Sequence, residues 1–198
     1  SDFAEQTDRQ AIVQSTADME NKPDIKLHFV ESGDISKFYT TEGKEFDAGD
    51  DDGVWLDCRF AEERHLNVGD NITFEFDGEK ITKQIKGLGY SPEYIYESSP
   101  NSLTPDFSQM GFAYLSHDAY HGDLDYDTML VKYNCSDSEF KEKLDDSIEY
   151  LSFTKREDQL SVAKFSDEMA QHKMIGDVFP IVFILVTFLT LLTTMTRD

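Results

Sequence analysis

The stretch NVGDNITFEFDGEKITKQIKGLG, residues 67–89, carries the clearest structural signal in the chain. Apolar and polar residues alternate over residues 72–76 and, after the pair Asp77-Gly78, again over residues 81–85. Alternation with a period of two is typical of strands with one buried face, and Asp-Gly favours a two-residue turn between such strands. The stretch therefore predicts an antiparallel β-hairpin.

Strands and helices are mixed on both sides of this hairpin. Further strands are predicted in DIKLHFVE after Pro23, GVWLDC, GFAYLS and TMLVKY. Helices are predicted in RFAEERHL, which would pack through Phe60, Ala61 and Leu66, and in SDSEFKEKLDDSIEYL, with Phe140, Leu144, Ile148 and Leu151 on one face. We therefore expect an α+β fold with a mixed, largely antiparallel sheet and flanking helices, plus stalk helices and a C-terminal transmembrane helix segment.

The charge balance limits the partners that the chain can have. Asp and Glu number 40 against 18 Lys and Arg, which gives a formal net charge of -22. Such a chain repels nucleic acid and anionic lipid headgroups, because both carry phosphate. A cationic partner fits the charge, and so does an acidic surface that serves only solubility.

The C-terminal stretch FPIVFILVTFLTLLTTMTRD contrasts with this acidic composition. Residues 179–195 contain no charged side chain and would extend about 26 Å as a helix at 1.5 Å per residue. A signal peptide would lie at the other end of the chain, and a buried helix would show a polar stripe. We therefore predict a membrane span that ends before Arg197. The residues predicted to be embedded in the membrane are Phe179, Pro180, Phe183, Phe188 and Leu191.

Four regions are expected along the chain. An N-terminal stalk or helical segment would occupy residues 1–22, and the extracytoplasmic α+β core domain residues 23–160. A juxtamembrane helix would follow over residues 161–178, and residues 179–198 would begin the transmembrane helix.

Several of these segments resemble a known family. VWLDCRFAEERHLNVGDNITFEF (residues 54–76) resembles the strand, helix and hairpin of the extracytoplasmic core domain in MacB/FtsX-type ABC transporter permeases. SPEYIY (residues 91–96) is similar to a segment of the large Gram-positive members, and LTTMTR (residues 192–197) is similar to the start of the transmembrane module. The resemblance runs from about residue 26 to residue 198.

The resemblance implies a role that spacing and composition do not show. Permeases of this family pair with a separate cytoplasmic ABC ATPase, and in several members ATP-driven helix motion is passed mechanically to the extracytoplasmic domain. The chain would then lie in the cell membrane with its folded domain outside the cell. It would have no catalytic residue and no cofactor of its own.

The segment from residue 90 to residue 110 is the place where we expect a partner contact. Tyr90, Tyr94, Tyr96 and Phe107 lie there among three prolines, and aromatic side chains often anchor interfaces. The alternative is that these rings cover the core of the domain itself. Both alternatives are open at this point.

Two acidic or histidine-rich stretches raise the possibility of a metal site. DAGDDDG at residues 47–53 lacks the alternate spacing of a calcium loop, so a solvated turn is expected. His117 and His121 lie four residues apart, but Gly122 would end a helix there, so a surface loop is expected rather than a zinc site. Cys58 and Cys135 lack metal-ligand spacing, and either free thiols or one long-range bridge are compatible with them.

Two other interpretations compete with the permease. One is a membrane-anchored extracellular receptor that binds a cationic peptide or protein. The other is a secreted metallohydrolase, which would require a metal at His117 and His121. The chain would also contact membrane lipid through its tail, so any dimer formed through residues 179–195 without lipid would be an artefact.

Overall fold

The structure is a computed structural model that describes residues 4–94, 105–145 and 152–158. In the C-terminal part it describes residues 169, 173, 180, 183–184 and 186–190. The chain divides into two compact units, residues 1–153 and residues 154–198. The predicted end of the core domain at residue 160 thus lies within the second unit.

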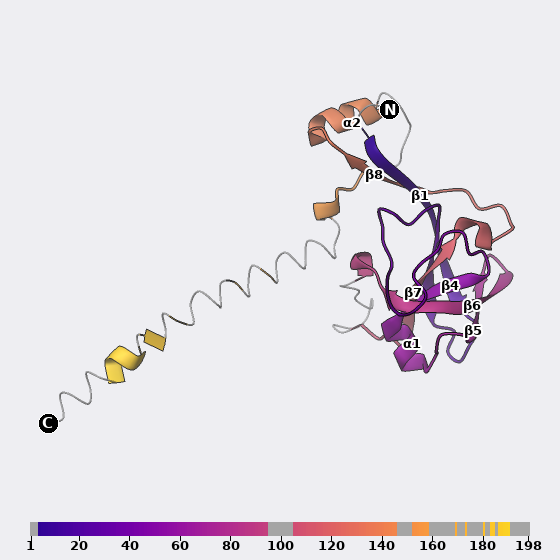
Figure 1. Cartoon of the computed structure of the whole chain (residues 1–198), viewed down its shortest axis with the longest axis horizontal. Coiled ribbons are helices and arrows are strands. Elements are labelled where there is room, and N and C mark those ends of the chain that lie inside the picture. The colour runs from indigo at the N-terminus through magenta and orange to yellow at the C-terminus, as the bar shows by residue number, and fades with distance from the viewer. Residues whose placement is uncertain are drawn as a thin grey trace. The chain divides into compact units, whose positions relative to one another are not determined.

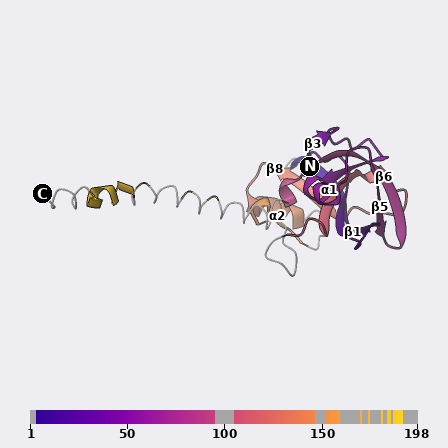
Figure 2. The ribbon, with the colours of Figure 1, turned by 90° about the horizontal axis from the view of Figure 1, so that it is seen from below.

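The predicted hairpin is confirmed. It consists of β5 (Asn71–Phe76) and β6 (Glu79–Tyr90), which pair antiparallel. Asp77 and Gly78 have φ angles of 49° and 80°, which is the positive φ at both central positions that a type I′ turn requires. The two strands run side by side in both views (Figure 1 and Figure 2).

Six strands of the first unit pair into a closed ring. Besides the hairpin, the ring contains β1 (Ala4–Ala17), β2 (Asp24–Val30), β4 (Gly53–Asp57) and β7 (Met110–Ser116). The order is β2-β7-β4-β6-β5-β1, and β1 pairs with β2 to close it. The β2–β7 and β4–β6 pairs are parallel and the others are antiparallel. The α+β class and the mixed, largely antiparallel sheet are therefore confirmed.

Both faces of the β2-β7-β4 part of the ring are buried. Successive side chains of a strand point to opposite faces, so Leu56 and Trp55 of β4 enter different clusters. The larger cluster includes Leu27, Phe29, Leu56, Phe60, Phe74, Ile85 and Leu115. The second cluster consists of Val30, Phe38, Trp55, Tyr94, Phe112 and Tyr114, with Phe46 packed against it. Burial on two faces explains why GVWLD is a continuous apolar run rather than an alternating one.

Two strands extend from the ring. β3 (Tyr39–Gly43) pairs antiparallel with the end of β6, where a Cβ added at Gly89 would collide with the backbone of Tyr39. β8 (Thr128–Tyr133) pairs antiparallel with residues 4–10 of β1. We call this two-stranded part, residues 4–10 and 128–133, the ribbon.

The helices are short. α1 (Cys58–Arg64) directly follows β4, and the Asp57 carboxylate caps it by accepting from the backbone N–H of Arg59 at 3.0 Å. α2 (Asp137–Asp145) follows the ribbon, and the ring of its Phe140 stacks on Tyr133 of β8 at 4.1 Å. The remaining helical turns are 3-10 helices: η1 (Pro92–Tyr94), η2 (His117–Ala119) and η3 (Arg156–Asp158).

The helix predicted in residues 1–22 is wrong, because β1 occupies residues 4–17. In its second half Ile12 and Val13 are β-branched, which favours a strand. The pattern is hard to recognise in the sequence because three of the buried residues, Asp8, Gln10 and Ser15, are polar. Each of them is buried with a hydrogen-bond partner, whereas Ala11, Val13 and Ala17 of the same strand belong to the larger core cluster or pack against it.

The described residues of the second unit between 169 and 190 are all helical. Within the part of the chain that the structure describes, no helix combines the length and the apolar character needed to cross a membrane. Pro180, Phe183 and Phe188, three of the predicted membrane residues, are in helical conformation and exposed, whereas Phe179 and Leu191 lie outside the described residues.

Candidate partner-binding surface

Two exposed tyrosines lie at the junction of β3 and β6. Tyr90, which was predicted as a partner contact, is the last residue of β6, and Tyr39 is opposite it at the start of β3. Each side chain is 44% exposed, and their rings stack at 5.5 Å with an interplanar angle of 16°. Such a pair offers a flat apolar surface with two hydroxyl groups at an edge strand, as protein interfaces often do.

Tyr94 occupies a different environment, although it is only four residues further on. It is 5% exposed, and its ring stacks on Phe112 of β7 at 4.3 Å. Its hydroxyl group forms a hydrogen bond with Nε2 of His28. The ring thus forms part of the second core cluster, and it anchors η1 to the body of the domain. Tyr96 lies outside the described residues.

His28 is fully buried and joins three elements. Its Nδ1 lies 3.1 Å from Oε1 of Gln10 in β1, and its ring stacks on Tyr114 of β7 at 4.8 Å. Because an amide oxygen can only accept, Nδ1 carries the proton and Nε2 accepts from the Tyr94 hydroxyl. Burial, helped by the charge of Lys26, lowers the pKa of His28 to about 3. The imidazole is therefore neutral at physiological pH.

A second buried polar group supports the same turn. The Tyr114 hydroxyl lies 2.7 Å from Ser36 Oγ and 3.2 Å from Ser91 Oγ, and Ser36 in turn donates to the carboxylate of Glu93. Burial raises the pKa of Tyr114, so the hydroxyl stays protonated and can donate. The turn from Ser91 to Tyr94 is consequently held by hydrogen bonds to two strands and to the loop before β3.

Phe107, the fourth predicted contact, lies just before β7 and is half-buried. The guanidinium of Arg59 lies 4.2 Å from the centre of its ring. The same guanidinium forms two hydrogen bonds to the buried carboxylate of Asp57, at 3.0 and 2.9 Å. This arrangement orients one face of Phe107 against α1.

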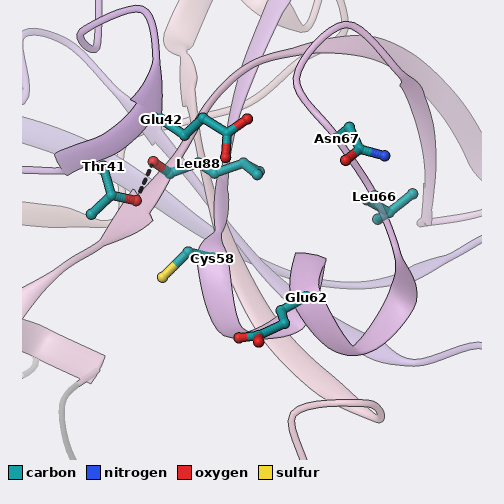
Figure 3. Close-up of a pocket in the computed structure, with 7 residues that line it drawn as sticks. All are labelled: Thr41, Glu42, Cys58, Glu62, Leu66, Asn67 and Leu88. Atoms are coloured by element: carbon teal, nitrogen blue, oxygen red, sulfur yellow. Dashed lines mark hydrogen bonds between the residues drawn. The ribbon is translucent and has the colours of Figure 1, made fainter.

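A pocket of about 330 Å³ opens between β3, α1 and the turn that follows α1 (Figure 3). Its lining residues are Thr41, Glu42, Cys58, Glu62, Leu66, Asn67 and Leu88. This pocket could not be predicted from the sequence, because its residues come from four separate segments and form no motif. The two leucines of the lining were predicted in other roles. Leu66 was expected to pack as part of a helix, and Leu88 to lie in a strand of the hairpin.

Cys58 and Cys135 are both free and half-buried. The pKa of the Cys58 thiol is raised by burial and by the neighbouring carboxylate of Asp57. The thiol is thus protonated and weakly nucleophilic at neutral pH.

Of the two stretches considered for metal binding, the acidic one contains a turn, and the histidine one is the 3-10 helix η2 followed by irregular backbone. Backbone N–H groups donate to Asp47 at 2.9 Å and to Asp50 at 3.1 Å within the acidic stretch. His117 contacts the carbonyl oxygen of Leu124 at 3.0 Å and stacks on Tyr126, while His121 is exposed. Among the described residues, no group of three or more His, Cys, Asp or Glu is arranged to hold a metal ion.

The chain matches no family model and no curated protein. It is similar to several solved structures, including the following three. The first is the extracellular domain of the noncanonic ABC-type transporter YknZ from Gram-positive bacteria, at 17% identity and a TM-score of 0.48, covering 70% of each chain.

The second is the periplasmic region of MacB from Actinobacillus actinomycetemcomitans, at 12% identity and a TM-score of 0.46, covering 72% of this chain and 65% of that one. The third is a domain assigned to a permease protein from Porphyromonas gingivalis, at 13% identity and a TM-score of 0.42, covering 72% of this chain and 62% of that one. The first two are extracellular or periplasmic parts of the transporter class that the sequence resemblance names.

Proposed function

We propose that this chain is the extracellular domain of an FtsX/MacB-type ABC transporter permease, together with the start of the transmembrane helix that follows it. The segments that resemble the family support the proposal. The longest of them, residues 54–76, forms β4, α1 and β5, and β4 and β5 are the two ring strands on either side of β6. In this proposal the domain has no catalytic activity.

The observation that carries the proposal is the uncharged run of residues 179–195 at the end of a chain with a net charge of -22. Five residues of this run, Phe183, Ile184, Val186, Phe188 and Leu189, are between 55% and 71% exposed. Exposed apolar side chains in such number are costly in water and favourable in lipid. Residues 161–178 would then be a juxtamembrane helix, and residues 179–198 would begin the span.

The domain would work as a mechanical element. In this proposal a cytoplasmic ABC ATPase drives the transmembrane helices of the complete permease, and the motion reaches the extracellular domain through the segments that connect it to the membrane. The motion would be used for export, release or signalling outside the cell. Tyr90 and Phe107 would contribute to a partner contact at the surface, since both rings are accessible at least in part.

Extraction from membranes tests whether the tail is a span. The full chain, expressed in a bacterium, should remain in the membrane fraction after washing with alkaline carbonate. Replacing both Ile184 and Phe188 by Asp should release it, because two carboxylates at the centre of a span cost several kcal/mol. The matched control adds the same two charges at the exposed residues Ser152 and Thr154, and this variant should stay in the membrane. A wild-type chain recovered in the soluble fraction contradicts the proposal.

The gene sequence on both sides of the region that encodes this chain distinguishes the permease from a single-span receptor. The permease requires one span before residue 1 and further spans after residue 198. A gene with nothing hydrophobic before residue 1 and no span beyond the tail favours the receptor instead. The neighbouring genes should include one for an ABC ATPase.

A further inference from the structure

The pocket beside α1 owes its shape to an irregularity in β3. The register of β3 against β6 shifts between Thr40 and Glu42, so Thr41 is an additional residue in the strand. In a regular strand, adjacent side chains point to opposite faces, but at this bulge both Thr41 and Glu42 line the pocket. The hydroxyl of Thr41 donates to the carbonyl oxygen of Leu88 at 3.1 Å, which keeps Thr41 in this position.

The lining combines an apolar centre with an acidic edge. Leu88 is 7% exposed and Leu66 packs against the larger core cluster, whereas Glu42 and Glu62 are exposed. In the view of Figure 3 the two carboxylates lie at opposite sides of the pocket, with Cys58 and Leu88 between them. Within the described part of the chain, no hydrogen bond or ion pair involves either carboxylate.

This lining fits a long basic side chain. Lysine and arginine carry an alkyl stem that packs on apolar surface and a charged group that stays at the wet end. A stem over Leu66 and Leu88 would bring the charged group to a carboxylate at the edge of the pocket. An anion would be repelled by the carboxylates and by the net charge of -22, and a fully apolar ligand would bury the carboxylates without a partner.

We propose that this pocket receives a lysine or arginine side chain of a basic peptide segment from a partner. The charged group pairs with one of the two carboxylates, Glu42 or Glu62, and Leu66 and Leu88 contact the alkyl stem. Cys58 lies beside the bound side chain and is covered by it. The inference does not depend on the chain being part of a permease, so either conclusion can fail without the other.

Binding of tetralysine with blocked ends tests the pocket. The full chain in an uncharged detergent at low salt should bind tetralysine, and should not bind tetra-(Nε-acetyllysine), which has the same stem without the charge. The double variant E42Q/E62Q should weaken binding at least tenfold in calorimetric titration. Both residues are exposed, and circular dichroism checks that the variant folds.

The matched control is E45Q/E63Q, which removes the same two charges from exposed residues outside the pocket. Its affinity for tetralysine should stay within twofold of wild type. An equal loss in both double variants means that the acidic surface as a whole attracts the peptide, and this overturns the proposal. Absence of binding by the wild-type chain also overturns it.

Alkylation of the two cysteines locates the bound peptide without any substitution. At saturating tetralysine, the reaction of Cys58 with iodoacetamide at pH 8.5 should slow at least fivefold, as followed by mass spectrometry of the alkylated peptides. Cys135 is also free and half-buried but lies outside the pocket, so its rate should not change. Unchanged alkylation of Cys58, or equal slowing at both cysteines, contradicts the assignment.

Discussion

The ring and the ribbon share the strand β1 but are stabilised in different ways. In the ring, the strands enclose fully buried side chains such as Phe29 and Phe74. In the ribbon, β8 has no fully buried residue, and Arg9 of β1 forms an exposed ion pair with Glu31, which follows β2. Its apolar support is a small aromatic cluster around Phe140 of α2.

The difference shows what closure contributes to a small sheet. A two-stranded ribbon is marginally stable by itself in water, because it cannot bury an apolar face. In a ring every strand is paired on both sides and the strands share one buried interior, so β1 can contain buried polar residues and remain a strand of the sheet. We therefore expect substitutions in the ring to destabilise the whole domain and substitutions in the ribbon to act locally.

The largest effect is expected for Phe74→Ala in β5. The side chain is fully buried in the larger core cluster, so its removal leaves a cavity in a closed interior. We expect a loss of about 3–5 kcal/mol in the free energy of unfolding. Urea unfolding followed by the fluorescence of Trp55, which is 1% exposed, measures it.

Thr73→Ala, on the adjacent position of the same strand, is the control for Phe74. The Thr73 hydroxyl pairs with that of Thr82 at an exposed position, so a loss of about 1 kcal/mol or less is expected. Equal effects of the two variants would mean that the interior of the ring is not the main source of stability.

The buried His28 should make the stability of the ring depend on pH. Its pKa is lowered to about 3 in the folded state, against a value near 6.5 in the unfolded chain. The unfolded state therefore binds the proton first as the pH falls, and stability is lost from pH 6.5 downwards. Between pH 6.5 and pH 5 this loss should be about 2 kcal/mol.

The measurement compares urea unfolding of wild type and His28→Gln at several pH values. The variant should be less stable at pH 7, because the packing of the imidazole is lost, but its stability should fall less steeply below pH 6.5. His121→Gln, at an exposed histidine, should keep the wild-type pH dependence. If the stability of His28→Gln falls below pH 6.5 as steeply as that of wild type, another group causes the loss of stability.

A smaller and local effect is expected for Phe140→Ala in α2. Phe140 is 2% exposed, but its partners Tyr133 and Phe153 lie at the edge of the domain and can close on the space that is left. We expect a loss of about 1 kcal/mol in unfolding followed by Trp55. Hydrogen exchange should become faster in β8 and α2 and stay unchanged in β5 and β6. Faster exchange throughout the ring would show that the two regions unfold together.

The smallest effect is expected for the ion pair between Arg9 and Glu31. Both side chains are exposed, and water screens their attraction. Arg9→Gln should leave the midpoint of urea unfolding unchanged within error at 150 mM salt. A marked shift would mean that the ribbon contributes to the stability of the ring through this contact.

The hairpin, the buried strand β4 and the helix α1 could be predicted because each depends on neighbours in the sequence. The alternation around Asp77-Gly78 specifies the turn and the face of both strands. The structure of residues 4–17 could not be predicted in the same way. Whether Gln10 is buried depends on His28, which belongs to another strand.

In the candidate site too, some features could be predicted from the sequence and others could not. Tyr90 and Tyr94 were named from aromatic composition alone, and composition cannot tell that the Tyr90 ring is exposed and that the Tyr94 ring, in η1, is buried. The pocket with Glu42 and Glu62 was not foreseen, since it depends on a bulge in β3 and on the packing of β3 near α1.

The sequence by itself determined the α+β class, the hairpin, the acidic surface and the uncharged tail, because these follow from local periodicity and composition. Only the tertiary structure decided that six strands close into a ring, that β1 is one of them and that two carboxylates flank an apolar pocket. Strand closure and pocket formation join residues far apart in the chain, and such pairings arise from packing rather than from local preference.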